Sequence, residues 1–131
     1  MASFRTESII DVPADEAWAR LSDLANTHML FPGVLTACTL DGDVRVVTFA
    51  DGTVVRERIA TVDPDARRLA YGVIERFEYH ASMMEIVAVN AQQCRLVWIS
   101  DVLPDAAIER VTGLMKKGTA AFKTALCPSP S

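Results

Sequence analysis

The sequence predicts an α+β fold in which a curved, seven-stranded antiparallel sheet wraps around one long C-terminal helix, with two short helices after the first strand. Strand-like runs rich in valine, isoleucine, threonine and aromatic residues follow one another after Gly33. Short turn signals separate them, and a single long amphipathic segment comes last. Because one helix cannot fill the whole concave face of such a sheet, this order of elements predicts an internal cavity.

The first strand is expected over residues 4–12, and a short helix follows it at once. The strand ends at Val12-Pro13, since proline removes a backbone donor and suits the first turn of a helix. Two acidic residues at positions 15 and 16 fall in that turn, where they favour the helix dipole. A second short helical turn is predicted over residues 26–33, because Pro32-Gly33 is a strong turn signal.

Six further strands are predicted from regularly spaced turn signals. Asp41-Gly42 and Asp51-Gly52 are typical of tight hairpins, and residues 63–65 and 90–93 mark two later turns. Short turns of this kind join antiparallel neighbours. The strands are expected over residues 34–40, 44–50, 54–62, 69–74, 80–89 and 95–102.

The last helix is predicted over residues 104–126, with an apolar stripe that faces the sheet. Glycine inside a helix costs up to about 1 kcal/mol relative to alanine. Close approach of the helix to a strand or to a bound molecule would explain why position 118 is glycine, whereas Gly113 is interpreted as a tolerated surface residue. The stripe consists of Ile108, Val111, Met115, Gly118, Phe122 and Ala125.

The charge balance argues against nucleic acid as a partner. The 131 residues include 17 aspartates and glutamates against 13 lysines and arginines, and the basic residues are scattered, with short pairs such as Arg67-Arg68. Binding to nucleic acid requires a concentrated positive face. With half of its residues hydrophobic the chain can bury its own core, so we expect one domain over residues 1–131.

The cysteines and the N-terminus favour a cytoplasmic location. Cys38, Cys94 and Cys127 are odd in number and far apart, which indicates reduced thiols and neither a disulfide framework nor a thiolate metal site. The N-terminus lacks the apolar stretch of a signal peptide, and no apolar run reaches the roughly 18 residues of a membrane span. We therefore expect no membrane insertion, and a loose tail over residues 127–131.

Three stretches carry a resemblance to a known family: residues 10–18 (IDVPADEAW), residues 52–59 (GTVVRERI) before Asp63-Pro64, and residues 96–98 (LVW) before the last helix. From residue 4 to residue 126 the chain is similar to the START/Bet v 1-like (SRPBCC) helix-grip superfamily, and more narrowly to its polyketide cyclase/dehydrase-type branch. The resemblance implies the helix-grip fold. It implies no single activity, because the superfamily contains lipid carriers, hormone receptors and cyclases.

Plant abscisic-acid receptors of the same superfamily offer a looser comparison. Their gate and latch motifs are replaced here by residues 49–53 and 75–78, so a hormone receptor of that kind is not implied. The comparison does imply an inward carboxylate at Glu57 and an inward aromatic side chain at Tyr79.

Glu57 is the candidate for chemistry. If it faces inward, then Val55, Ile59 and Thr61 do so too and the arginines between them face solvent, because side chains alternate along a strand. A carboxylate on an apolar wall is desolvated, which raises its pKa and suits a general acid, a general base or a hydrogen-bond partner of a ligand. The alternative is a structural Glu57 paired across the sheet with an arginine.

The sequence does not determine which face of the strand over residues 80–89 points inward, because both faces carry apolar residues. If Tyr79 points inward, then Met83 and Glu85 follow it, and Glu85 becomes a second inward carboxylate. Otherwise Met84 and Ile86 lie inside and Glu85 faces solvent. His80 is expected on the face opposite Tyr79.

The sequence carries no motif for metal-dependent, nucleotide-binding or α/β-hydrolase chemistry. His28 and His80 have no helical partner at the spacing of a metal site, so neither a metal nor a cofactor is expected. The sequence contains no glycine-rich phosphate loop and no G-x-S-x-G motif. These absences argue against nucleotide-binding and α/β-hydrolase chemistry.

The predicted function is binding of a small hydrophobic or amphipathic molecule, such as a lipid, a polyketide or an aromatic compound. One alternative is an enzyme of cyclase, dehydratase or isomerase type with Glu57 as its acid or base, and another is a partner-binding or homodimerising module. Residues 29–31 and the Asp51-Gly52 turn are expected to frame the entrance. The cavity is expected to be lined by Phe31, Val55, Glu57, Ile59, Tyr71, Tyr79, Met83, Glu85, Val111, Met115, Gly118 and Phe122.

Overall fold

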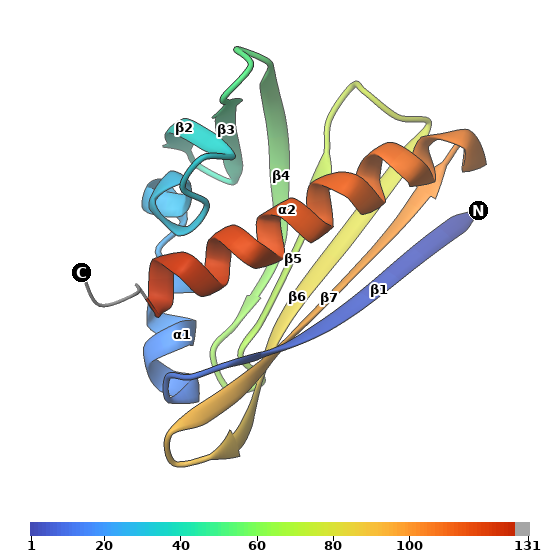
Figure 1. The fold of residues 1–131 in the computed structure, drawn as a ribbon. Helices are drawn as coiled ribbons and strands as arrows, with labels where there is room; N and C mark the ends of the chain where they lie inside the picture. Colours follow the sequence, from blue (N-terminus) through green and yellow to red (C-terminus); the bar gives the residue numbers. More distant parts are fainter. Residues whose placement is uncertain (128–131) are drawn as a thin grey trace.

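The computed structural model describes residues 1–127, which form a curved seven-stranded antiparallel sheet with a long helix across its concave face (Figure 1). The strand order is β1-β7-β6-β5-β4-β3-β2, so β1 joins the last strand at one edge and β2 forms the other edge. The elements are β1 (Ala2–Ile10), α1 (Ala14–Leu21), η1 (Leu24–Leu30), β2 (Leu35–Asp41), β3 (Val44–Phe49), β4 (Val54–Asp63), β5 (Arg68–Val73), β6 (Tyr79–Asn90), β7 (Gln93–Leu103), η2 (Asp105–Ala107) and α2 (Ile108–Leu126).

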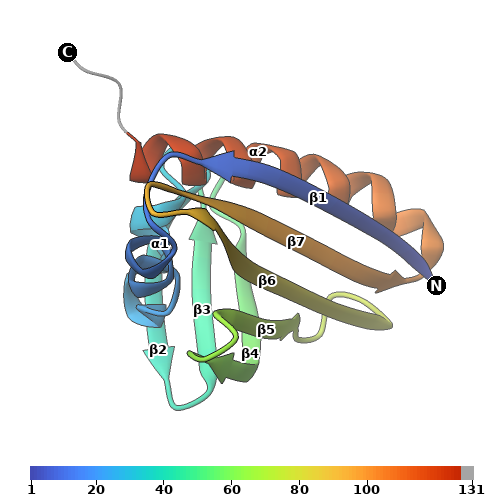
Figure 2. The same ribbon diagram turned by 90° about the horizontal axis from the view of Figure 1, so that it is seen from below.

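The predicted architecture is confirmed: one long C-terminal helix lies against one curved sheet. Figure 2 shows α2 running beside β1 while the sheet curves away from it toward β2. Four of the five expected tail residues, 128–131, lie outside the described residues, and Cys127 is half-buried against the core. No helix within residues 1–127 has both the length and the apolar character that crossing a membrane requires.

Of the two short helical segments after β1, η1 packs against β2 and β3, and α1 packs against β6, β7 and η1 (Figure 1). As predicted, Pro13 precedes α1 and two acidic residues occupy its first turn. The second segment, η1, is a 3₁₀ helix that begins two residues earlier than expected, at Leu24, and ends before Phe31. Gly33 follows with φ +80°, a conformation that glycine adopts without strain.

The predicted Asp-Gly turns join β2 to β3 and β3 to β4. Gly42 and Gly52 have φ values of +61° and +89°, which explains why glycine follows aspartate at both turns. The Asp51 carboxylate also accepts a hydrogen bond from the backbone N–H of Thr53 at 2.9 Å. These turns set the registers of β2, β3 and β4, and hence which side chains face α2.

The apolar stripe of α2 packs against the sheet, and Gly118 makes its closest approach. A Cβ atom at Gly118 would lie 2.9 Å from two atoms of the Trp98 ring on β7, whereas one at Gly113 would meet nothing within 4 Å. The interpretation of Gly118 as a close-approach residue is therefore confirmed. The helix can lie this close to β7 only because residue 118 has no side chain.

Alanine substitutions at the two glycines are expected to change stability in opposite directions. Gly118→Ala should lower the free energy of unfolding by about 1–3 kcal/mol, because the new methyl group overlaps the buried Trp98 ring. Gly113→Ala should raise it by about 0.5–1 kcal/mol, since alanine is the better helix former at an exposed site. Urea unfolding of both variants measures this; a shift of the same sign in both would contradict the packing described for Gly118.

Candidate functional site

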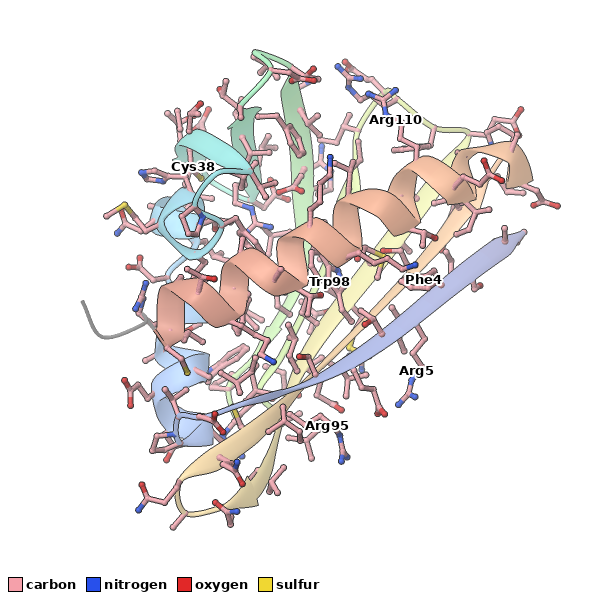
Figure 3. All side chains as sticks on the ribbon, viewed as in Figure 1. Phe4, Arg5, Cys38, Arg95, Trp98 and Arg110 are labelled. Atoms are coloured by element: carbon pink, nitrogen blue, oxygen red, sulfur yellow. The ribbon has the colours of Figure 1, made fainter. Side chains whose placement is uncertain are left out.

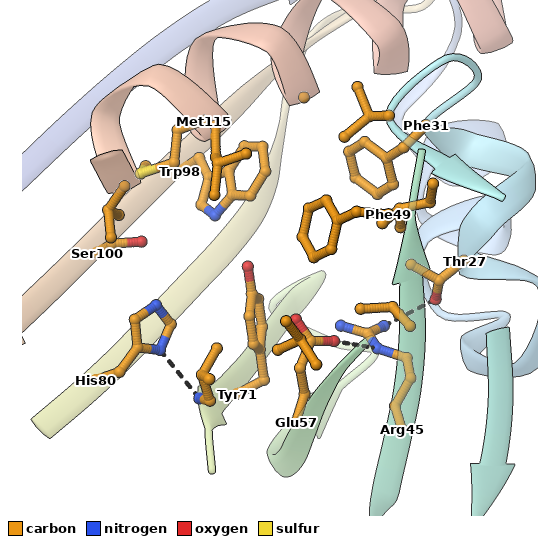
Figure 4. Close-up of a pocket in the computed structure, with 18 of the residues that line it drawn as sticks. Thr27, Phe31, Arg45, Phe49, Glu57, Tyr71, His80, Trp98, Ser100 and Met115 are labelled. Carbon is orange, nitrogen blue, oxygen red and sulfur yellow. Dashed lines mark hydrogen bonds and ion pairs between the residues drawn. The ribbon is translucent and has the colours of Figure 1, made fainter. Parts of the chain in front are cut away.

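A cavity of about 310 Å³ lies between α2 and the concave face of the sheet (Figure 4). Strands β3 to β7 form its wall, α2 covers it, and side chains of α1, η1 and the segment before β2 close one end. Its lining residues are Leu21, Thr27, Phe31, Val34, Leu35, Arg45, Val47, Phe49, Asp51, Thr53, Val55, Glu57, Leu69, Tyr71, Val73, Arg76, Phe77, His80, Met84, Trp98, Ser100, Arg110, Val111, Leu114, Met115 and Gly118.

Strand alternation determines which residues reach the cavity. On β4, Val55 and Glu57 are buried and line it, while Arg56 and Arg58 are exposed on the outer face, as predicted. On β3 the inward positions begin with Arg45, which lies directly opposite Glu57 in the β3–β4 register. A charged pair is thereby placed on an otherwise apolar wall.

Arg45 and Glu57 form a buried ion pair at one end of the cavity. Arg45 Nε donates to Glu57 Oε1 at 2.8 Å, and Arg45 Nη1 donates to the Thr27 hydroxyl, also at 2.8 Å. Thr27 in turn donates to the carbonyl of Leu24, so the pair is tied to η1. The guanidinium also lies 5.3 Å from the centre of the Tyr71 ring, a favourable cation–π distance.

Burial and the ion pair act in opposite directions on the protonation of Glu57. Burial raises the pKa of the Glu57 carboxyl, and the adjacent Arg45 charge and hydrogen bond oppose that rise. The arrangement fits the structural alternative predicted for Glu57, since its carboxylate accepts from an arginine across the sheet. Its position in the lining also leaves it accessible to a bound molecule.

Uncharged polar groups occupy the neighbouring wall. Burial raises the pKa of Tyr71 to about 12, so the phenol stays neutral and can donate a hydrogen bond. Trp98 Nε1 donates to the Ser82 hydroxyl at 3.0 Å, and the Ser82 and Ser100 hydroxyls are 2.8 Å apart. Trp98 is therefore both a packing residue in contact with Phe31 and Gly118 and part of a buried hydrogen-bond chain.

The rim of the cavity carries charged side chains. Arg76 lies in the loop between β5 and β6, and Arg110 lies on α2 near that loop (Figure 3). Asp51 comes from the β3–β4 turn. The Thr53 N–H lowers the pKa of the Asp51 carboxyl, and Arg110 acts in the same direction. The apolar interior therefore ends in a polar rim.

The structure places most of the predicted binding residues in one lining. The sequence of β4 and the stripe of α2 located them correctly, and Phe31 and Tyr71 join them from other elements. Within residues 1–127, no three side chains of histidine, cysteine, aspartate and glutamate group together as metal ligands. The predicted residues that line the cavity are Phe31, Val55, Glu57, Tyr71, Val111, Met115 and Gly118.

The predicted inward position of Tyr79 is wrong, and with it that of Met83 and Glu85. Tyr79 is 44% exposed, because β6 turns the other set of side chains toward α2. On that inward face Ser82 and Met84 are buried, opposite Ser100 and Trp98 of β7. The predicted alternative for this strand, with Met84 and Ile86 inside, is the one the structure shows.

Two further predicted lining residues pack elsewhere. Ile59 is half-buried against the core, and a β-bulge after it breaks the alternation, so Thr61 is exposed. Phe122 is fully buried beneath Phe31, with ring centres 6.1 Å apart, and does not reach the cavity. Both residues support the wall without forming its surface.

The predicted entrance is only partly right. Of residues 29–31, Phe31 alone lines the cavity: Leu30 is buried in the core, and Met29 is 61% exposed away from the lining. Asp51 lines it as expected. A short 3₁₀ helix sends successive side chains in different directions, which the sequence pattern did not resolve.

Sequence reasoning missed His80 as a site residue. It was placed correctly on the face opposite Tyr79, but that face is the inward one. Its Nδ1 accepts a hydrogen bond from the backbone N–H of Val73 at 3.1 Å. The available signal was the alternation itself, which puts His80 in phase with Met84 and Ile86.

Comparison with known proteins supports the fold described above. The family described as polyketide cyclase / dehydrase and lipid transport matches residues 1–126. No curated protein matches the sequence. The family match covers every element of the fold, including all strands that line the cavity.

Several solved structures have the same helix-grip fold. The XoxI protein of Bacillus cereus superposes with a TM-score of 0.88 at 18% identity, covering 98% of this chain and 97% of that one. Norcoclaurine synthase from Thalictrum flavum gives 0.77 at 20% identity, with 98% and 95% covered. The di-domain ARO/CYC BexL of the BE-7585A biosynthetic pathway gives 0.81 at 18% identity, covering 95% of this chain and 46% of that one.

Proposed function

Because the chain belongs to the polyketide cyclase/dehydrase and lipid transport family, we propose that its cavity binds one small hydrophobic or amphipathic molecule, such as a lipid, a polyketide or an aromatic compound. The observation that carries the proposal is the space of about 310 Å³ between sheet and helix, walled mainly by apolar side chains. A volume of this size is typical of small-molecule sites.

Apolar burial would supply most of the affinity. A ligand that loses about 200 Å² of apolar surface to the cavity gains about 5 kcal/mol. Met84 and Met115 lie on opposite walls, and their flexible side chains adapt to ligands of different outline. The charged rim suits a polar group at the outer end of an amphipathic molecule.

The Arg45–Glu57 pair weighs in favour of binding and against proton transfer by Glu57. A general acid or base must exchange its proton during turnover, whereas an arginine that cannot deprotonate donates to this carboxylate at 2.8 Å. The pair instead offers a fixed dipole that can orient a bound molecule. We therefore prefer a binding role to the cyclase-like alternative.

Native mass spectrometry of freshly purified protein tests this function. We expect a population with one added small mass, which denaturing spectra of the same sample lose and an organic extract contains. The non-covalent loss separates a bound molecule from a covalent modification. Protein that keeps only the mass of the chain, even after incubation with a lipid extract of the host cells, would contradict the proposal.

A further inference from the structure

His80 presents an unusual hydrogen-bond donor to the cavity. Its ring lines the wall between the Phe77 ring, stacked at 5.2 Å, and the Tyr71 ring, tilted at 6.1 Å between centres. These two aromatic neighbours hold the imidazole plane in place. Figure 4 shows one ring nitrogen bonded to the backbone of β5 and the other directed toward the cavity.

The backbone of β5 fixes the tautomer of His80. Val73 N–H donates to Nδ1, and a backbone amide cannot reverse the direction of this bond. Nδ1 therefore carries a lone pair, and the neutral ring holds its proton on Nε2. Gly72 permits this geometry, because a Cβ atom there would lie 2.7 Å from the His80 carbonyl oxygen.

The ring is neutral for a second reason. Burial lowers the pKa of His80, and the Asp101 carboxylate opposes this only in part. Protonation would also place a hydrogen on Nδ1 against the Val73 N–H. The cavity therefore meets an uncharged N–H donor, which suits a neutral acceptor.

Several of the other polar groups of the wall are already engaged with one another. Arg45 donates to Glu57 and Thr27, and Trp98 donates to Ser82. Among the residues drawn in Figure 4, no group accepts from His80 Nε2. A ligand oxygen placed at Nε2–H would accept a hydrogen bond that a hydrocarbon ligand leaves unmade.

The following inference rests on the proposed function. We propose that the cavity selects apolar molecules that carry a carbonyl group, and that His80 Nε2–H donates a hydrogen bond to the carbonyl oxygen. Ketones, esters and enones supply such an oxygen beside hydrocarbon. Pure hydrocarbons of the same shape fill the space but leave the His80 donor unpaired.

A matched pair of probes tests the assignment: 2-acetylnaphthalene and 2-isopropenylnaphthalene differ by a carbonyl oxygen in place of a methylene group. Titration calorimetry compares the two probes on wild type and His80→Asn. The amide oxygen introduced by this substitution can still accept from Val73 N–H, but no N–H reaches the position of Nε2. We expect His80→Asn to weaken 2-acetylnaphthalene about 3- to 10-fold and 2-isopropenylnaphthalene less than about 2-fold.

The same substitution at the other histidine is the control, since His28 does not line the cavity. His28→Asn should change neither affinity. Equal changes for both probes in His80→Asn, including no change, overturn the assignment. Loss of discrimination in Tyr71→Phe but not in His80→Asn also overturns it, because the donor is then the phenol. If neither probe binds wild type, this inference is overturned, whereas the proposed function is tested separately by native mass spectrometry.

A spectroscopic measurement on the wild type does not depend on the folding of any variant. The infrared band of 2-acetylnaphthalene labelled with ¹³C at the carbonyl should move to lower frequency in the complex than in hexane, as a hydrogen-bonded carbonyl does. A band at the hexane position overturns the proposal.

Discussion

Replacing Arg45 with methionine is expected to lower the free energy of unfolding by about 3–5 kcal/mol. Arg45 is 3% exposed, and its removal leaves the Glu57 carboxylate buried without its partner. It also removes the donor to Thr27 and the cation beside the Tyr71 ring. Chemical unfolding at neutral pH measures the loss.

The loss should depend on pH in a defined direction. Burial raises the pKa of Glu57, and without Arg45 nothing equivalent opposes the rise. The folded state then binds a proton more readily than the unfolded chain, so stability falls as pH rises through the folded pKa. The stability loss in Arg45→Met should be smallest near about pH 4, close to the ordinary pKa of a glutamate, and should grow as the pH rises. A deficit that grows toward low pH would contradict a desolvated Glu57.

Two companion variants separate the buried pair from arginine loss in general. Arg45→Met combined with Glu57→Leu should regain most of the lost stability, because no charge is then left buried. Arg58→Met removes an exposed arginine from β4, where it pairs with exposed Asp43, and should cost less than about 1 kcal/mol. Equal losses of stability in Arg45→Met and Arg58→Met would show that the cost of removing the arginine does not depend on whether its ion pair is buried.

The order and type of the elements could be predicted because local signals determine them. Asp-Gly turns need glycine at positive φ, proline begins α1, and the stripe of α2 repeats at helical spacing. The inward face of β4 could also be predicted. Because Arg56 and Arg58 are exposed on one face of the strand, only the alternate side chains are left for the interior. Each of these features depends on residues close together in the sequence.

Two other features depend on contacts between different strands: which face of β6 points inward, and which residue pairs with Glu57. Both faces of β6 carry methionine or β-branched residues, so only its register with β7 decides that His80 and Met84 face inward. Glu57 meets Arg45 because the turn at Asp51-Gly52 places them opposite each other. The His80 tautomer depends on a single N–H beyond the end of the β5–β6 ladder. No local pattern contains these contacts.

Filling the cavity is expected to abolish binding. Val55 and Val54 are adjacent on β4 with opposite orientations: Val55 is 8% exposed and lines the cavity, whereas Val54 is 53% exposed on the outer face. In Val55→Trp the indole enters the space that a ligand needs. Affinity for 2-acetylnaphthalene should fall at least about 100-fold, or about 2.7 kcal/mol. Val54→Trp adds the same ring to the outer face and should bind like wild type.

Thermal unfolding of both tryptophan variants shows whether they are folded before affinity is compared. The Val55→Trp indole replaces empty volume, so we expect a stability cost at the low end of the about 1–3 kcal/mol seen for overpacked cores. A variant that is folded and cannot bind separates loss of the cavity from loss of the fold.

Calorimetric titration of 2-acetylnaphthalene into wild type, Val54→Trp and Val55→Trp is therefore the most direct test of a ligand-binding interior. The structure predicts saturable binding of one molecule per chain to the first two proteins and none to the third. Binding of the probe to Val55→Trp with the wild-type affinity would show that the molecule is held outside the space between sheet and helix.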